Sequence, residues 1–170
     1  MSDQNALARR LASLDRLPPW LRPVVLTRII GATVKFVGTA GVKCETLTET
    51  EGIFTLANHR RAQNHIGSVH AAAMALLAET ATGMVVGMNV PDAAVPVIKS
   101  LHVDYNKRTK GALRAHATLT AEQIARIKGT QKGEVTVPVV VTDESGREPI
   151  ACEMVWAWVP KKRKPKPTGE

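Results

Sequence analysis

The most uniformly apolar part of the chain runs from Ile66 to Met88. Apart from His70, this segment contains one ionisable side chain, Glu79. Apolar residues on every side are typical of a helix that is buried all round, and Asn89 and Pro91 mark its predicted end. A carboxylate inside such a helix is costly to desolvate unless it is paired or hydrogen-bonded. We therefore interpret Glu79 as a candidate functional residue.

Alternation of apolar and polar residues predicts strands on both sides of this helix. Two strands, near Val42–Leu47 and Gly52–Asn58, precede it, and the turn between them indicates a hairpin. Four more segments follow the helix, and Pro138 inside one of them indicates a sheet edge or a bulge. The pattern predicts an antiparallel sheet with one face on a core, and hence an α+β protein. The four later segments cover residues 97–106, 113–119, 135–142 and 150–158.

The N-terminal part of the chain shows a weaker helical pattern. Leucines three or four residues apart predict a first helix that starts after a cap at Ser2 or Asp3. A second short helix is predicted over Trp20–Ile30, with Gly31 as its end.

Length and composition fit one folded domain. The chain has 170 residues, of which 44% are hydrophobic, and this size favours one core rather than two. We expect a helical segment over residues 1–40, the main domain over residues 41–160 and a disordered tail over residues 161–170. The tail is mostly Lys, Arg and Pro, a composition that cannot bury a core.

The net charge of +8 raises the alternative that the protein binds nucleic acid or an anionic membrane. The tail concentrates this charge, and the aromatic content of 4% is low for base stacking. We therefore do not expect nucleic-acid binding as the main function. Deletion of residues 161–170 is predicted to remove any such binding.

Cys44 and Cys152 have the spacing of neither a disulfide framework nor a metal site. Each falls in a predicted strand and is interpreted as a small core residue rather than a nucleophile. The sequence has no Gly-rich phosphate loop, metal-binding triad or nucleophile elbow, and we expect neither a metal nor a cofactor. It shows no secretory signal and no membrane span, so a reducing, cytoplasmic setting is expected.

Asn64, Gly67, His70 and Glu79 follow one another at intervals of three, three and nine residues. With the small pair Ala71-Ala72 after the histidine, this spacing resembles the signature of hotdog-fold acyl-CoA thioesterases of the phenylacetate-degradation type. The predicted order of strands and helix is also similar to the hotdog fold, in which an antiparallel sheet wraps a long central helix. The resemblance covers nearly all of the main domain and implies hydrolysis of an acyl-CoA thioester.

Thioester hydrolysis needs a carboxylate that activates water or attacks directly, and donors aimed at the oxyanion. The resemblance implies that Glu79 is this general base or nucleophile, and its apolar surroundings should raise its pKa. Otherwise Glu79 would cap a buried network with Thr80, Thr82 or a strand hydroxyl. The resemblance also implies that the backbone N–H of Ala71, in the first helical turn, helps to form the oxyanion hole. The family commonly has Gly here, and the Ala methyl group narrows the approach.

The loop before the helix holds further implied site residues. Asn64 would orient the thioester carbonyl or the water, although asparagine is also common in turns. Gly67 would supply a tight turn. His70 would support the loop through hydrogen bonds, and the neighbouring His65 could assist Asn64 or have a structural role.

Ser100 lies in an alternating row with Ile98 and His102 and is the candidate hydroxyl for holding the water, although the family hydroxyl falls nearer Ile98. Basic residues after that strand would meet the nucleotide and phosphates of coenzyme A, and a solvated basic turn is an equal alternative. These residues are Lys107, Arg108 and Lys110, with Arg60 and Arg61 as a second cluster beside the site.

Hotdog proteins pair their sheets, so the resemblance implies a homodimer or a dimer of dimers with sites between subunits. One subunit would supply Glu79, while the sequence leaves open which chain supplies Asn64 and which acyl group is bound. The alternative function is a non-catalytic hotdog module that binds acyl-CoA or fatty acyl ligands. Ala71 in place of Gly, and the displaced hydroxyl, favour that alternative.

Overall fold

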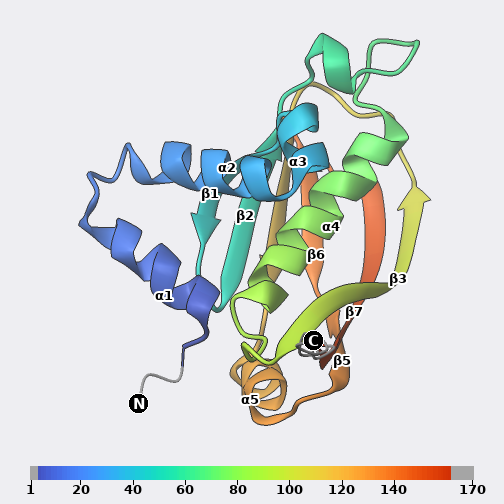
Figure 1. Cartoon of the computed structure of the whole chain (residues 1–170). Helices are drawn as coiled ribbons and strands as arrows, with labels where there is room; N and C mark the ends of the chain where they lie inside the picture. The colour runs from blue at the N-terminus through green and yellow to red at the C-terminus, as the bar shows by residue number, and fades with distance from the viewer. Residues whose placement is uncertain (1–3, 162–170) are drawn as a thin grey trace, which may run out of the picture.

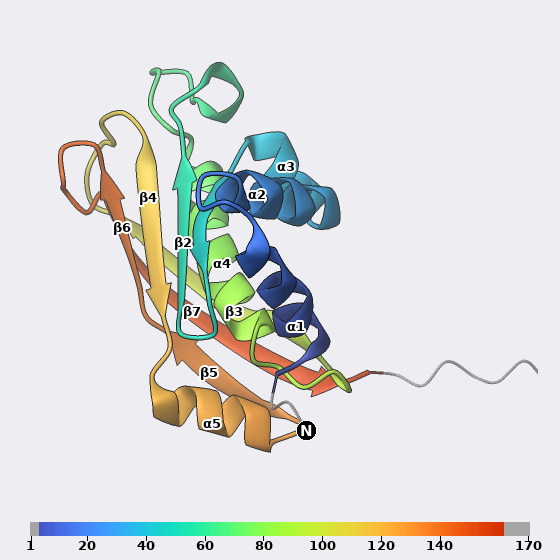
Figure 2. The same cartoon turned by 90° about the vertical axis from the view of Figure 1, so that its left-hand side faces the viewer.

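The buried helix expected around Glu79 is α4, Ala71–Gly87, and it lies at the centre of the molecule (Figure 1). The computed structural model describes residues 4–161. In it, antiparallel strands curl around one side of α4, and the N-terminal helices cover part of the other side (Figure 2). The α+β arrangement of a sheet around a long central helix is therefore confirmed. The expected tail lies outside the described residues, apart from Lys161.

The strands form two antiparallel groups. One group has the order β1 (Lys43–Leu47), β2 (Glu51–Leu56), β4 (Leu113–Thr118) and β6 (Val139–Asp143). The other has the order β3 (Ala94–Tyr105), β7 (Ile150–Pro160) and β5 (Gly133–Val137). The pairing of β1 with β2 confirms the predicted hairpin.

Pro138 divides what the pattern predicted as one strand into β5 and β6. Because proline has no N–H to donate, the ladder is interrupted there, and each half pairs with a different neighbour. The Pro138 carbonyl still accepts a hydrogen bond of 3.1 Å from the Thr118 amide. The break lets the sheet change direction and curl around α4 (Figure 2).

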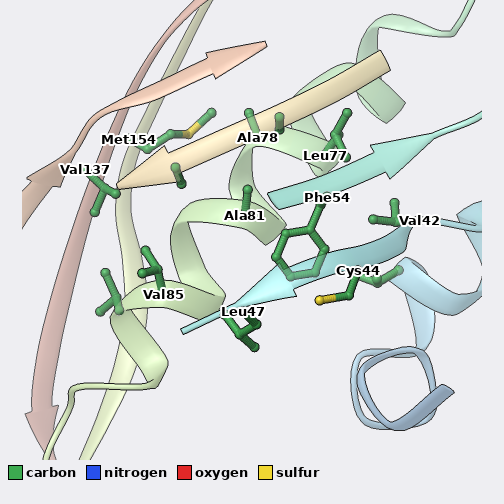
Figure 3. Packing of buried hydrophobic residues seen from close by; sticks show 14 of the residues in the cluster. Val42, Cys44, Leu47, Phe54, Leu77, Ala78, Ala81, Val85, Val137 and Met154 are labelled. Atoms are coloured by element: carbon green, nitrogen blue, oxygen red, sulfur yellow. The ribbon is translucent and has the colours of Figure 1, made fainter. Parts of the chain in front are cut away.

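Small residues on α4 allow the sheet to approach the helix closely. Ala78 and Ala81 are fully buried among side chains of three strands, including Phe54, Val137 and Met154 (Figure 3). At Gly52 in β2, a Cβ atom would lie 2.9 Å from the carbonyl oxygen of Ala81, so no larger residue fits without a shift. The core therefore forms around α4, as its apolar composition predicted.

The N-terminal helices differ from the prediction in three respects. Helix α1, Ala6–Ala12, begins at Asn5, whose Oδ1 accepts a hydrogen bond from the Ala8 amide; the predicted caps Ser2 and Asp3 lie outside the described residues. Helix α2, Arg22–Thr33, continues through Gly31 instead of ending there. A third helix, α3, follows over Lys35–Ala40. Short 3-10 turns lie at Ser13–Arg16 and Arg60–Ala62.

Helix α5, Ala121–Gly129, was not predicted from the sequence. Its first turn carries a capping box, in which the Thr120 side chain and Gln123 exchange hydrogen bonds with each other's backbone amides. Ile127 is its one fully buried residue. The capping signal Thr120 with Gln123 three residues later was present in the sequence and identifies this helix start.

Candidate functional site

Glu79 lies in the middle of α4 on the side that the sheet does not cover. Its side chain is partly buried and lines a pocket of about 230 Å³. The pocket lies between α4, the N-terminal helices and strands β3 and β7, and it is open to solvent on one side. Its other walls are almost entirely apolar and include Leu7, Val34, Val37, Met84, Pro96 and Trp156.

Two contacts fix the shape of this pocket. The Asn5 side-chain amide donates hydrogen bonds to the carbonyl oxygens of Gly87 and Val90, at 2.8 and 2.7 Å, and so ties α1 to the end of α4. The Trp156 indole N–H donates to Thr82 Oγ1 at 2.9 Å, with the ring packed on Gly83. These residues were not among the predicted site residues. The inward alternation of β7 was the available signal for Trp156.

Burial raises the pKa of the Glu79 carboxyl, as its apolar surroundings predicted. Within residues 4–161, no group donates a hydrogen bond to this carboxylate. The hydroxyl of Thr80 donates to the Leu76 carbonyl oxygen and that of Thr82 to the Ala78 carbonyl oxygen, so both bond to the helix itself. Thr82 also donates to the Glu79 carbonyl oxygen at 3.0 Å, but neither hydroxyl bonds to the Glu79 carboxylate within the described chain.

The first turn of α4 leaves one backbone donor free. His70 is the N-cap, and its Nδ1 accepts a hydrogen bond of 3.1 Å from the Ala72 amide. In the described part of the chain the Ala71 amide donates to no acceptor. Tyr105 on β3 donates its hydroxyl to the Ala71 carbonyl oxygen at 3.0 Å and holds this peptide in place. A free N–H at a helix start suits a negatively charged oxygen.

The loop before α4 is organised by Asn64. Its Oδ1 accepts hydrogen bonds of 3.1 Å from the amides of Ile66 and Ser68, which is the turn role that asparagine commonly has. Gly67 has φ = +73°, a left-handed conformation that favours glycine, so the predicted tight turn is present. The Asn64 Nδ2 group has no acceptor among residues 4–161 and remains available to a ligand.

Ala71 and Glu79 are separated by two turns of the same helix. At 1.5 Å per residue, their positions lie about 12 Å apart along the helix axis. Within one chain, the Ala71 N–H and the Glu79 carboxylate therefore cannot act on the same carbonyl group.

A basic pocket lies beside this loop. Arg108 donates from Nε to Ser68 Oγ at 2.9 Å and from Nη2 to the Ile66 carbonyl oxygen at 2.7 Å. The pocket has a volume of about 430 Å³ and is also lined by Thr109, Lys110 and Arg147. The Thr109 hydroxyl is buried without a partner in the described structure. Thr109 and Arg147 were not predicted as site residues.

Asp143 joins the two segments that line the basic pocket, the one at Lys110 and the turn before Arg147. The Asp143 carboxylate accepts hydrogen bonds from the backbone amides of Lys110 and Ser145 and from the Ser145 hydroxyl. Burial alone would raise its pKa, but these hydrogen bonds outweigh burial and lower the pKa to about 2. The carboxylate is thus charged, and it fixes the backbone on which Lys110 and Arg147 stand.

Ser100 does not join the group around Glu79 within the chain. A bulge between Ile98 and Ser100 breaks the alternation of β3, so Ile98 pairs with Trp156 while Ser100 pairs with Val155. Trp156 faces α4, and its neighbour Val155 faces the opposite side of the sheet. The prediction that Ser100 shares a row with Ile98 is wrong for this reason.

The other predicted residues are exposed. His65 lies at the tip of the loop, and Arg60 and Arg61 lie on the preceding 3-10 turn. Lys107 follows β3 and bonds only through its backbone amide, to the Pro149 carbonyl oxygen, in the described chain. The structure therefore groups Asn64, Gly67, His70 and Ala71 with Arg108. The side chains of Arg60, Arg61, His65 and Lys107 lie at the surface outside this group.

The cysteines lie in strands, as predicted. Cys44 is buried in the core and Cys152 packs partly against it. Burial raises the pKa of Cys44 to about 12 and that of Cys152 to about 11, so neither is an activated nucleophile. Among residues 4–161, no cluster of His, Cys, Asp and Glu could hold a metal ion, and no helix has the length and apolar character to cross a membrane.

Solved structures with similar folds include three proteins described as thioesterases. A protein of unknown function from Pseudomonas aeruginosa, described as a probable thioesterase, is 25% identical with a TM-score of 0.72, covering 82% of this chain and 97% of its own. A putative thioesterase from Shewanella oneidensis is 13% identical with a TM-score of 0.69, covering 81% of this chain and 97% of its own. A thioesterase from Haemophilus influenzae is 13% identical with a TM-score of 0.64, covering 79% of this chain and 88% of its own.

The curled sheet around α4 is therefore the hotdog fold of thioesterase-family proteins. The chain belongs to the family described as Domain of unknown function (DUF4442), which it matches over residues 23–159. Comparison with curated protein sequences found no match.

Proposed function

We propose that the protein hydrolyses acyl thioesters of coenzyme A, with Glu79 as the general base or nucleophile. One observation carries this proposal: a carboxylate with a raised pKa, unpaired among the described residues, faces an apolar pocket. A structural ion pair would lower the pKa of a carboxyl. Keeping an unpaired carboxylate beside apolar walls costs stability, and such a cost is typical of a reactive group.

The site is completed by a second copy of the chain. Because about 12 Å separates Ala71 from Glu79 along one helix, the Ala71 N–H of one chain would work with the Glu79 carboxylate of the other. Asn64 bonds to the loop that leads directly into Ala71, so it would come from the same chain as Ala71. The loop and the base thus belong to different subunits of a homodimer.

Two exposed features support this assembly. Strand β3 pairs only with β7 among the described strands, so its other edge is free, and it bears exposed Val97 on one face and exposed Leu101 and Tyr105 on the other. An edge strand of this length with apolar side chains is normally covered. On α4, the positions that the chain leaves incompletely covered recur every three or four residues. They are Ala71, Ala72, Ala75, Leu76, Glu79, Gly83, Met84 and Gly87.

The proposed reaction uses each group in a defined way. The Ala71 N–H and the Asn64 Nδ2 group donate to the thioester oxygen and stabilise the negative charge that develops on it. Glu79 either takes a proton from a water that attacks the carbonyl carbon or attacks that carbon itself. In the first route the carbon–sulfur bond breaks and the proton taken by Glu79 passes to the leaving thiolate. In the second route the thiolate leaves and takes a proton from water, and a further water hydrolyses the acyl anhydride on Glu79, which releases the acid and restores the carboxylate.

The apolar pocket at Glu79 and the basic pocket at Arg108 suit the two ends of the substrate. The apolar pocket of about 230 Å³ lies below the range of about 300–1,000 Å³ of drug-sized ligand sites, which favours a short or medium acyl chain. Arg108, Lys110 and Arg147 line the basic pocket and would bind coenzyme A phosphates through charge-assisted hydrogen bonds.

The test is thiol release from short-, medium-, long-chain and aromatic acyl-CoA substrates. We expect turnover of at least one class, and loss of turnover in Glu79→Gln with substrate affinity retained. Equal activity in the variant would contradict the mechanism. Tight binding of acyl-CoA without thiol release by the unmodified protein would favour the non-catalytic module instead.

A further inference from the structure

Helix α2 exposes apolar side chains on the side that faces away from the rest of the molecule. Leu26 and Ile30 are buried beneath it, yet Val24 is 45% and Ile29 41% exposed on the other side. Trp20, in the turn just before the helix, is 74% exposed. A helix that is apolar on its outer side as well is normally covered by something.

The same surface is strongly basic. Between residues 4 and 42 the chain has six basic residues and a single acid, Asp15. Asp15 forms an ion pair of 2.7 Å with Arg22, so it does not offset the remaining cations. Arg16, Arg28 and Lys35 are exposed around α2. The surface therefore combines an aromatic and aliphatic face with surplus positive charge.

We propose that α2 and the turn before it dock the protein on the surface of an anionic membrane. Tryptophan and aliphatic side chains insert at the boundary between lipid headgroups and acyl chains. Arginine and lysine keep their charge in the headgroup layer while their stems lie along the apolar region. A negatively charged leaflet attracts cations that lie close to an apolar face, and the attraction grows with each added charge.

Two other occupants fit the surface less well. A second copy of the chain in a symmetric contact would set this cation-rich surface against itself, and the acids beside it, Asp15 and Glu45, are already paired with Arg22 and Arg114. Nucleic acid would satisfy the cations, but interfaces with nucleic acid are polar. Val24 and Ile29 would gain nothing from phosphates.

A hollow beside the docking face suits a lipid headgroup. The pocket between α2 and β1 has a volume of about 550 Å³ and includes Val24, Arg28 and Lys43 in its lining. Glu45, also in this lining, is paired with Arg114 at 3.0 Å. Within residues 4–161, Arg28 and Lys43 form no ion pair, so they supply positive charge to the hollow.

The layer of helices that carries the docking segment also forms part of the Glu79 pocket, through Leu7 of α1, Val34 just after α2 and Val37 of α3. In Figure 2 this layer lies on the side of α4 opposite the sheet. A membrane bound at the outer side of α2 would therefore approach the molecule without covering the sheet or the β3 edge.

The test is sedimentation of the full chain with vesicles of phosphatidylcholine and phosphatidylglycerol, compared with phosphatidylcholine alone. We expect binding to the anionic vesicles only. Trp20→Ser with Ile29→Ser, and separately Arg28→Glu with Lys43→Glu, should each weaken binding by about tenfold or more. Val140→Ser, and Arg126→Glu with Lys132→Glu, are matched controls far from α2 and should change it less than about twofold. The tail is intact in all of these variants.

Tryptophan fluorescence gives a second readout. The chain has three tryptophans, and Trp156 and Trp158 are buried, so a blue shift on vesicle binding reports Trp20. The proposal is overturned if the α2 variants bind like the unmodified chain or if deletion of residues 161–170 alone removes binding. It is also overturned if the α2 variants lower the mass of the assembly or affect only RNA binding.

Discussion

His70 Nδ1 accepts a hydrogen bond of 3.1 Å from the Ala72 amide. This contact satisfies the second amide of α4 and leaves the first one, on Ala71, without an acceptor in the described chain. The side chain that the resemblance assigned to loop support thus determines which backbone donor is left for a ligand.

Ala71→Pro should abolish most of the thioesterase activity without disrupting the fold. Proline is favoured in the first helical position and lacks the N–H proposed for the oxyanion hole. The preceding residue, His70, has ψ = 143°, which a following proline accepts. Loss of one such donor typically lowers kcat by about 10²–10³-fold. Steady-state kinetics and a melting curve measure both effects.

Ala71→Gly is the control for that experiment, because it keeps the N–H and removes the methyl group. It should retain or raise activity. Full activity in Ala71→Pro would exclude the Ala71 amide from the reaction, whatever the result for Ala71→Gly.

Glu79→Gln should inactivate the enzyme and at the same time stabilise it at neutral pH. Burial raises the folded-state pKa of Glu79, so the folded protein prefers the protonated acid. The stability that this preference provides is complete below the unfolded pKa of 4.5 and is lost as pH rises through the folded pKa. Glutamine is neutral throughout, so the variant should gain stability over the unmodified protein at neutral pH.

Thermal melts between about pH 4 and 8 test this, with the difference in Tm growing as pH rises. The activity of the unmodified enzyme should follow the same ionisation, with kcat/KM increasing with pH toward a plateau. A variant that is less stable than the unmodified chain at every pH would mean that Glu79 has a structural partner.

The apolar and polar pattern was sufficient to predict the central helix, the hairpin and the curled sheet, because each depends on the burial of one face. It did not predict helix α3, and it missed α5 although Thr120 and Gln123 give a capping signal. Ser100 was misplaced because a single extra residue in β3 reverses the faces of a strand, and alternation alone does not locate a bulge.

The candidate site was predictable in part, for similar reasons. Glu79 stood out as a charge in an apolar helix, and the spacing to Asn64 pointed to the loop. The apolar pocket depends on how α1 and α3 pack on α4, which no local pattern encodes. Likewise, Thr109 and Arg147 line the same pocket only because the turn held by Asp143 folds against Lys110.

Gly83→Ala should distort the pocket beside Glu79. A Cβ atom at this position would lie 2.5 Å from the Trp156 ring, which must then move and give up its hydrogen bond to Thr82. Overpacking of this kind costs about 1–3 kcal/mol. Activity should shift among acyl-chain lengths, as measured with the acyl-CoA panel.

Gly129→Ala in α5 is the matched control, since nothing lies within 4 Å of its added Cβ atom. Alanine is the better helix former, so this control should be neutral or slightly stabilising. If Gly83→Ala behaves like the control in both stability and chain-length profile, Trp156 does not shape the pocket.

Asp143→Asn should destabilise the turn that carries Arg147 and change how stability depends on pH. Although burial would raise the pKa of Asp143, the hydrogen bonds from Ser145 and the Lys110 amide lower it to about 2 from 3.8. A lowered folded pKa contributes stability that is present above pH 3.8 and is lost as pH falls toward 2. The unmodified protein should therefore lose stability over this acid range. Asp143→Asn should lose less of it, starting from a lower Tm at neutral pH.

In the Asp143→Asn variant, Lys110 and Arg147 are no longer held by the carboxylate, so KM for acyl-CoA should rise more than kcat falls. Equal KM values with a lowered Tm would limit Asp143 to a structural role and remove the basic pocket from substrate binding.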